Sequence, residues 1–227
     1  MAKRVSSEAA LLMLHWQNSV CDPRGIWGKN LCRQIEKNSA IKNAQSVLST
    51  ARNRGVLTIF VNIGWRPGFP ELPENQYYPL LQSAKDDNKG IVGTWEVDVI
   101  DALRPVANES IVINFGSDSF EGTDLDRILR AHNIGHVFVS GQCIEHVVAT
   151  TIKRAANMGY NAILIKDATS GFTDSNYSAM LDILPLYCKL LTSAEFNLEA
   201  PYAGTARSEV TPESRNSFSG RVAWLRP

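Results

Sequence analysis

The sequence contains no run of about 18 consecutive apolar residues, the length that a membrane-spanning helix requires. Neither charge is in excess, since 23 lysines and arginines balance 23 aspartates and glutamates, so no overall field favours nucleic acid or an anionic membrane. The four cysteines lie far apart without a Cys-x-x-Cys pair, which indicates neither a disulfide framework nor a zinc site. We therefore expect a cytoplasmic protein that binds neither nucleic acid nor membrane.

What the sequence does have is enough apolar residues for one large core. With 227 residues, 44% of them hydrophobic, a single domain is the natural expectation. We expect it to span residues 1–195 and to be followed by an irregular polar tail, 196–227. The apolar run Glu8–Leu14 is followed by polar residues and by no small-residue cleavage site, so it predicts a buried strand rather than a signal peptide.

The stretch 122–168 predicts the unit around which the fold is built. His136–Gly141 and Asn161–Ala168 are short apolar runs, typical of strands that are buried on both faces. Between them, apolar residues recur at helical spacing from Val147 to Ala156. Strand, helix and strand with a right-handed crossover form the unit of a parallel sheet, whose ligands bind at the carboxyl ends of the strands. The loop 141–146 is therefore the first place to look for chemistry.

The rest of the chain alternates in the same way. Further strands are predicted at Glu8–Leu14, Val56–Asn62, Ser110–Phe115 and Lys189–Thr192, and helices at Ile35–Arg54, Trp95–Leu103, Thr123–Asn133 and Tyr177–Leu186. The connection Ile63–Gly90 is long and rich in proline, which is typical of a segment that shapes a site or meets a partner. About six strands that alternate with helices predict a doubly wound, mainly parallel α/β sheet.

Several segments, in their order along the chain, resemble the isochorismatase-like (cysteine hydrolase) superfamily. They are ALLMLHWQN, GTWEVDVIDAL, SFEGTDLDRILR, GHVFVSG with the loop after it, and GYNAILIKDATSGF. Together they cover residues 8–195. The resemblance implies a three-layer, Rossmann-like α/β/α sandwich, a small-molecule substrate, and assembly as a homodimer or homotetramer. Members of the superfamily hydrolyse amides, such as nicotinamide or N-carbamoyl compounds, or the vinyl ether of isochorismate.

The amidohydrolases of this superfamily use an aspartate, a lysine and a nucleophilic cysteine. The resemblance places these at His15, Asn114 and Val147, so all three are substituted here. A valine cannot attack a carbonyl, which excludes thioester chemistry at that position. Superfamily enzymes that act on isochorismate also lack the cysteine, but they keep the aspartate. Metal-binding members carry Asp-x-His after the second strand; the segment 62–66 has no such ligands, so we expect no metal and no cofactor.

Three residues are the candidate catalytic groups: His15, Glu145 and Cys143. A histidine has an unperturbed pKa of about 6.5, which suits His15 for acid or base catalysis unless hydrogen bonds at the sheet edge engage it. Cys143 is either a pocket-lining thiol, activated by the following helix N-terminus, or a small buried hydrophobe. Glu145 is either a helix cap or the acidic group that replaces the missing aspartate.

Four further residues are expected to contact the substrate: Trp95, Asn114, Ser19 and Val147. The superfamily places a tryptophan at the position of Trp95 against its substrate. The neutral amide of Asn114 would orient a carbonyl or hydroxyl group, although it cannot stabilise an anion as lysine does.

Three functions follow from these residues. The first is an enzyme that acts on a small metabolite by acid/base chemistry, through vinyl-ether hydrolysis, elimination or rearrangement, without a covalent nucleophile. The second is a catalytically silent family member that serves as a binding or scaffolding subunit. The third is an amidohydrolase whose nucleophile has moved to Cys143. Convergence of His15, Glu145 and Cys143 on an open cavity would favour an enzyme. A cavity filled by Val147 and Trp95 would favour a silent member.

Overall fold

The computed structural model describes residues 8–74 and 77–200. Within these residues the strands form a six-stranded sheet in the order β3-β2-β1-β4-β5-β6, and every neighbouring pair is parallel. The strands are β1 (Ala9–Leu14), β2 (Leu57–Ile63), β3 (Ser110–Asn114), β4 (His136–Gln142), β5 (Asn161–Ser170) and β6 (Lys189–Leu191). The prediction of a doubly wound, parallel α/β sheet is confirmed.

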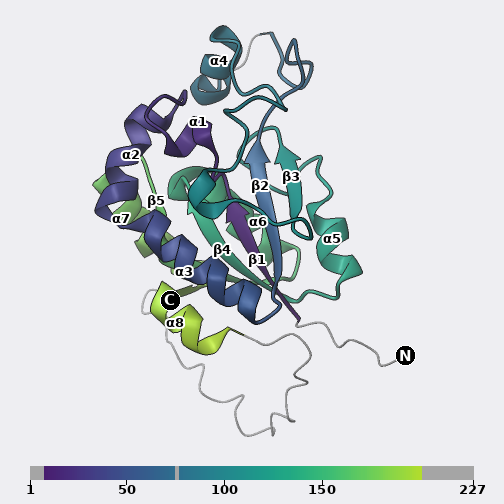
Figure 1. Cartoon of the computed structure of the whole chain (residues 1–227), viewed down its shortest axis with the longest axis vertical. Coiled ribbons are helices and arrows are strands. Elements are labelled where there is room, and N and C mark those ends of the chain that lie inside the picture. Colours follow the sequence, from purple (N-terminus) through teal and green to yellow (C-terminus); the bar gives the residue numbers. More distant parts are fainter. Residues whose placement is uncertain (1–7, 75–76, 201–227) are drawn as a thin grey trace, which may run out of the picture.

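Helices cover both faces of this sheet (Figure 1). They are α1 (Asn18–Cys21), α2 (Gly28–Lys37), α3 (Ala40–Asn53), α4 (Pro79–Asp86), α5 (Leu125–Ala131), α6 (Ala149–Asn157), α7 (Asp174–Ile183) and α8 (Ser193–Glu199), with short turns η1 (Asp101–Leu103), η2 (Ile144–Val148) and η3 (Leu184–Leu186). Apolar side chains of α2, α3 and α8 pack with Leu11 and Met13 of β1, and those of α5, α6 and α7 pack with Leu12 and Leu14. Since successive residues of a strand point to opposite faces, β1 is buried throughout. These layers are the predicted α/β/α sandwich.

The two central strands, β1 and β4, place the site. From β1 the chain continues to β2 on one side, whereas from β4 it continues to β5 on the other. Such a reversal opens a crevice at the carboxyl ends of the two strands. Gly141 pairs with Leu14 here, and a Cβ atom at Gly141 would lie 2.4 Å from the Leu14 carbonyl oxygen. Glycine is therefore required for the close approach of the two strands at the crevice.

Two of the predicted helices differ from the structure. The range Ile35–Arg54 is divided between α2 and α3, because the chain turns at Ser39, where φ is +51°. The range Trp95–Leu103 is a series of turns that ends in the 3₁₀ turn η1. Its carbonyl groups accept hydrogen bonds from the start of α1, Glu96 from the backbone N–H of Ser19 and Asp98 from that of Asn18. These long-range bonds replace the bonds of a helix.

The C-terminal boundary also differs from the prediction of an irregular tail from residue 196. Helix α8 runs from Ser193 to Glu199, and Thr192 and Glu195 form a capping box at its start. The pattern Thr-x-x-Glu is the sequence signature of that box, so this helix was predictable. Residues 201–227 of the predicted tail lie outside the described residues. Among the described residues, no helix is both long enough and apolar enough to cross a membrane.

Candidate functional site

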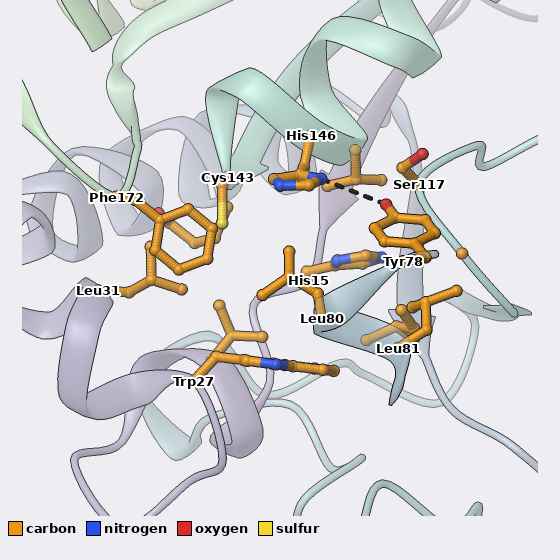
Figure 2. Close-up of a pocket in the computed structure, with 15 residues that line it drawn as sticks. His15, Trp27, Leu31, Tyr78, Leu80, Leu81, Ser117, Cys143, His146 and Phe172 are labelled. Carbon is orange, nitrogen blue, oxygen red and sulfur yellow. Dashed lines mark hydrogen bonds between the residues drawn. The ribbon is translucent and has the colours of Figure 1, made fainter. Parts of the chain in front are cut away.

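A small cavity of about 40 Å³ lies at the carboxyl ends of β1 and β4, and we call it the switch-point pocket (Figure 2). Strand ends, the start of α2 and the segment leading into α4 supply its walls. It is lined by His15, Val20, Trp27, Leu31, Ile63, Tyr78, Leu80, Leu81, Gly116, Ser117, Gln142, Cys143, His146, Val147 and Phe172. Four of these residues belong to the proline-rich connection 63–90, which therefore shapes the site as predicted.

His15 is the buried polar group at the end of β1, with its backbone at φ +52°. Its Nε2 atom lies 3.0 Å from Oδ1 of Asn114, and the Asn114 amide nitrogen donates to the carbonyl oxygen of Gly116 at 2.8 Å. Because that second bond fixes Asn114 Oδ1 as the acceptor, His15 carries its proton on Nε2. Its Nδ1 atom has no hydrogen-bond partner among the described residues.

Burial lowers the pKa of His15 to about 4, and the hydrogen bond to Asn114 offsets this only in part. The nearby His146 makes a smaller contribution to the same lowering of the pKa. The imidazole is therefore neutral at physiological pH, with a lone pair on Nδ1. It can accept a proton from an acidic group, but it holds no second proton to donate.

Cys143 and Val147 form the wall on the side of β4, and Figure 2 shows the sulfur of Cys143 directed into the cavity. Burial raises the pKa of the Cys143 thiol well above its ordinary value, and the charge of Glu145 adds to this effect. A thiol in this state is a poor nucleophile, because the thiolate is the reactive form. Val147 is 1% exposed and closes the wall with an inert side chain.

An aromatic group not predicted from the sequence closes the pocket on the side of α4. The hydroxyl of Tyr78 lies 3.3 Å from Nδ1 of His146, and their rings are stacked with centroids 6.1 Å apart (Figure 2). The ring of Phe172 meets His146 edge-on at 5.9 Å. Partial burial lowers the pKa of His146 as well, so the second histidine at this pocket also favours its neutral form.

Gln142, the last residue of β4, is the second unpredicted polar group. The residue is fully buried, and its Oε1 atom accepts a hydrogen bond from the hydroxyl of Ser170. Its amide nitrogen is buried and has no hydrogen-bond partner among residues 8–74 and 77–200. The peptide bond between Gln142 and Cys143 is cis.

The sequence matches the isochorismatase domain over residues 9–195, which is most of the chain. The chain belongs to the isochorismatase family. It is 24% identical over 175 residues to the ureidoacrylate amidohydrolase RutB of Variovorax paradoxus, a match that covers 72% of this chain and 69% of that protein.

Solved structures of the family share the fold. A cysteine hydrolase from Pseudomonas syringae superposes with a TM-score of 0.76 at 21% identity, over 87% of this chain and 97% of that one. An N-carbamoylsarcosine amidase from Thermoplasma acidophilum gives a TM-score of 0.65 at 23% identity, over 82% of this chain and 97% of that one. At these identities the likeness concerns the fold.

Within this isochorismatase fold, the residues assigned to the triad positions are brought together. His15 and Val147 line the switch-point pocket, and Asn114 is buried behind His15 and holds its ring. Cys143 also lines the pocket. The assignment of His15, Asn114 and Val147 to the family's triad remains an inference from the sequence.

Glu145, predicted as a catalytic residue, does not line the pocket. Its Oε1 atom accepts hydrogen bonds from the backbone N–H of Phe172 at 2.8 Å and from the amide of Asn176 at 2.9 Å. The carboxylate thus fixes the loop between β5 and α7. This bonding holds the carboxylate at Phe172 and Asn176, outside the residues that line the pocket with His15.

The structure also does not bring Ser19 or Trp95 to the pocket. Ser19 is buried in α1, where its hydroxyl accepts a hydrogen bond from the Gln17 amide at 2.9 Å. Trp95 is 41% exposed, and the guanidinium of Arg24 lies 4.6 Å from the centre of its ring. Because 95–103 is no helix, Trp95 is carried to the wall of a second and larger hollow.

That second hollow runs along the edge strand β3 and encloses about 890 Å³; we call it the β3 groove. Its lining includes Asn62, Val92, Trp95, Val97, Asp98, Asp101, Arg104, Ile111 and Ile113. Its described lining residues include no histidine and one cysteine, Cys21, a buried thiol whose pKa burial raises well above the ordinary value.

Sequence reasoning missed the pocket residues for different reasons. Gln142 could have been predicted from the sequence, because it is a polar residue at the end of a buried strand, the same feature that identified His15. No feature of the sequence places Trp27 and Tyr78 at the pocket, because α2 and the segment before α4 meet the strands only through the tertiary fold. Among the described residues, no group of three or more His, Cys, Asp or Glu side chains is arranged to hold a metal ion.

Proposed function

We propose that this isochorismatase-family chain is an enzyme that transforms a small metabolite by removing a proton, with the neutral imidazole of His15 as the base. The observation that supports it is the arrangement of His15 at the switch-point pocket. Its Nε2 proton is committed to Asn114, and its Nδ1 lone pair has no partner among the described residues. An oriented base of this kind contributes about 10²- to 10⁴-fold to a reaction rate.

The lowered pKa of His15, about 4, limits the types of reaction that this residue can assist. Hydrolysis of a vinyl ether begins with protonation of the substrate, for which a neutral imidazole is unsuited. Elimination and rearrangement begin with removal of a proton, which it can accept. Because the imidazole is a weak base, the substrate's proton has to be acidic already, as a C–H bond beside a carbonyl group is.

Amide hydrolysis has less support than proton removal. RutB and the N-carbamoylsarcosine amidase are named for amide hydrolysis. In this chain Val147 stands at the position that the resemblance assigns to the nucleophile. The thiol of Cys143 is held in its protonated form by burial. We therefore infer that this chain departs from the chemistry of those relatives.

Hydrogen–deuterium exchange at carbon tests this proposal without knowledge of the natural substrate. In D₂O, proton NMR would follow exchange beside the carbonyl of butanone, cyclopentanone, 2-oxobutyrate and levulinate. We expect the protein to accelerate exchange in at least one, and His15→Asn to reduce that acceleration about 100-fold or more. Asparagine tolerates the left-handed backbone of residue 15 but cannot act as a base. His136→Gln, at the opposite end of β4, is the matched control. Equal rates for wild type and His15→Asn would refute the role of His15.

A second candidate function, a catalytically silent binding subunit, is favoured by the size of the switch-point pocket. About 40 Å³ holds roughly three water molecules, and Val147 fills the wall beside it. This alternative predicts that no compound in the series exchanges faster than in buffer. The homodimer or homotetramer expected from the resemblance is likewise a proposal, and light scattering coupled to size-exclusion chromatography tests it.

A further inference from the structure

The walls of the switch-point pocket carry no formal charge. Aspartate, glutamate, lysine and arginine are all missing from its lining residues. Its two histidines have pKa values lowered by burial, so both favour the neutral form. The candidate acid Glu145 does not line the pocket; its Oε1 atom is bonded to Phe172 and to Asn176 of α7, and its Oε2 atom is buried without a hydrogen-bond partner among the described residues. A buried charge without a partner is strongly disfavoured, so this pocket selects against ionic ligands.

The pocket does carry an unpaired hydrogen-bond donor. Gln142 is fully buried, and the Ser170 hydroxyl occupies its Oε1 atom, which leaves the amide nitrogen without a partner in the part of the chain that the structure describes. Buried polar groups in folded proteins nearly always have a partner. An orphaned donor on a residue that lines a cavity therefore indicates an acceptor atom supplied from the cavity.

A second donor is placed beside the same cavity. The indole nitrogen of Trp27 is buried with no hydrogen-bond partner among the described residues, and Trp27 lies along the wall opposite Cys143 and His146 in Figure 2. The remaining wall is mainly apolar, including Leu31, Leu81 and Phe172. Mostly apolar walls with a few oriented polar groups are typical of sites for small organic molecules.

We infer that the switch-point pocket binds an uncharged small molecule with a carbonyl-type oxygen, which accepts hydrogen bonds from the Gln142 amide and the Trp27 indole. Gln142 is then a specificity-determining residue. The inference deepens the proposed function, on which it rests, because it names the substrate class of the same site. A carbonyl group held in this way also makes the neighbouring C–H bond acidic, which a weak base such as His15 requires.

Crotonamide and crotonate are suitable probes, since they are nearly isosteric and planar but differ in charge. Each would be titrated into the uniformly ¹⁵N-labelled full chain, and ¹H–¹⁵N spectra would follow the indole N–H signals, with that of Trp27 assigned through Trp27→Phe. We expect crotonamide to shift the Trp27 signal and crotonate to shift it at least tenfold less at equal concentration. Trp16 is the internal control, because its indole nitrogen is also buried and unpaired but the residue does not line the pocket. Its signal should stay unchanged.

The role of Gln142 is tested by Gln142→Leu, which removes the donor at similar size. We expect crotonamide to bind about tenfold more weakly, as for the loss of one hydrogen bond. Ser170→Ala keeps the amide donor and should retain the preference for crotonamide over crotonate. Thermal unfolding checks that each variant is folded, and the wild-type spectra decide the charge preference without any variant.

Two results would overturn the inference. In the first, crotonate shifts the Trp27 signal as strongly as crotonamide does; in the second, neither probe shifts it. Crotonamide binding requires no turnover, so this result is independent of deuterium exchange at His15. Binding of crotonamide without exchange activity would support the ligand class and contradict the proposed reaction. Deuterium exchange confined to the anions 2-oxobutyrate and levulinate would support the proposed reaction and contradict the uncharged ligand class.

Discussion

The switch-point pocket and the β3 groove differ in size, in burial and in the state of their polar groups. The groove encloses about 890 Å³ and the pocket about 40 Å³. Charged residues of the groove, such as Asp101 and Arg104, pair with one another in contact with solvent. Polar groups of the pocket, such as His15 and Gln142, are almost fully buried. Chemistry is to be expected in the smaller hollow, because desolvation is what shifts pKa values and leaves donors oriented toward a ligand.

The position of each hollow in the sheet explains this difference. The pocket lies where β1 and β4 diverge in their connections, so it is enclosed by segments from both halves of the chain. The groove lies along β3, an edge strand. Ile111 of that strand is 53% exposed, whereas Val147 at the pocket is 1% exposed. Two aliphatic side chains that both border a hollow thus experience very different environments.

The largest predicted effect concerns His15 and acid stability. The unfolded chain protonates this histidine at a pH of about 6.5, whereas the folded chain does so only at about 4. Between these values the unfolded state binds more protons, so stability falls as the pH drops. The full shift corresponds to about 3 kcal/mol. We expect the free energy of unfolding, measured by urea denaturation, to fall by that amount between pH 7 and pH 4 in wild type relative to His15→Asn.

If the unfolding free energies of wild type and His15→Asn changed with pH in the same way, His15 would not be desolvated. The contrast between the pocket and the groove would then disappear. Glu36→Gln supplies a control on an exposed carboxylate outside both hollows. Its profile should follow that of wild type through the same pH range.

The second prediction compares Val147 with Ile111. Val147→Ala removes buried methyl groups and leaves a larger cavity, so it should cost about 2 kcal/mol of unfolding free energy. Ile111→Ala removes more carbon atoms but from a half-exposed edge, so its cost should be less than half as large. Denaturant titrations of both variants measure the difference. Equal costs would mean that the β3 edge is covered in solution, for example by a second subunit.

The strands and the location of the switch-point pocket could be predicted from the sequence, whereas other features of the site depend on tertiary contacts. All six strands were predicted within two residues at either end, because each is a short apolar run bounded by polar turns, and the central strands β1 and β4 are buried on both faces. The location of the site at the carboxyl end of β4 followed from the same pattern. His15 was found because it is polar and directly follows a buried strand, and Gln142 directly follows the predicted strand His136–Gly141 in the same way.

Tertiary contacts decided the rest. The segment 95–103 has the composition of a helix, but its carbonyls bond to α1, which moves Trp95 away from the pocket. The local pattern around Glu145 fits a pocket acid as well as a structural carboxylate; only the approach of the loop before α7 distinguishes them. The pKa of His15 depends on how completely α2 and the α4 segment cover it, and no local pattern contains that information.

The smallest predicted effect is at Trp95, the residue that the family resemblance placed against the substrate. Its ring is 41% exposed at the β3 groove, and its main side-chain contact there is the Arg24 guanidinium, 4.6 Å from the ring centre. A cation–π contact at an exposed site is worth about 0.5–1 kcal/mol, so the loss of this contact in Trp95→Ala should lower the unfolding free energy by no more than that. Deuterium exchange and the crotonamide-induced shift of the Trp27 signal should both be unchanged, with Gln142→Leu as the matched loss inside the pocket. A large loss of deuterium exchange in Trp95→Ala would contradict this prediction and connect the β3 groove to the reaction. It would indicate that a ligand or another subunit bridges the β3 groove and the switch-point pocket.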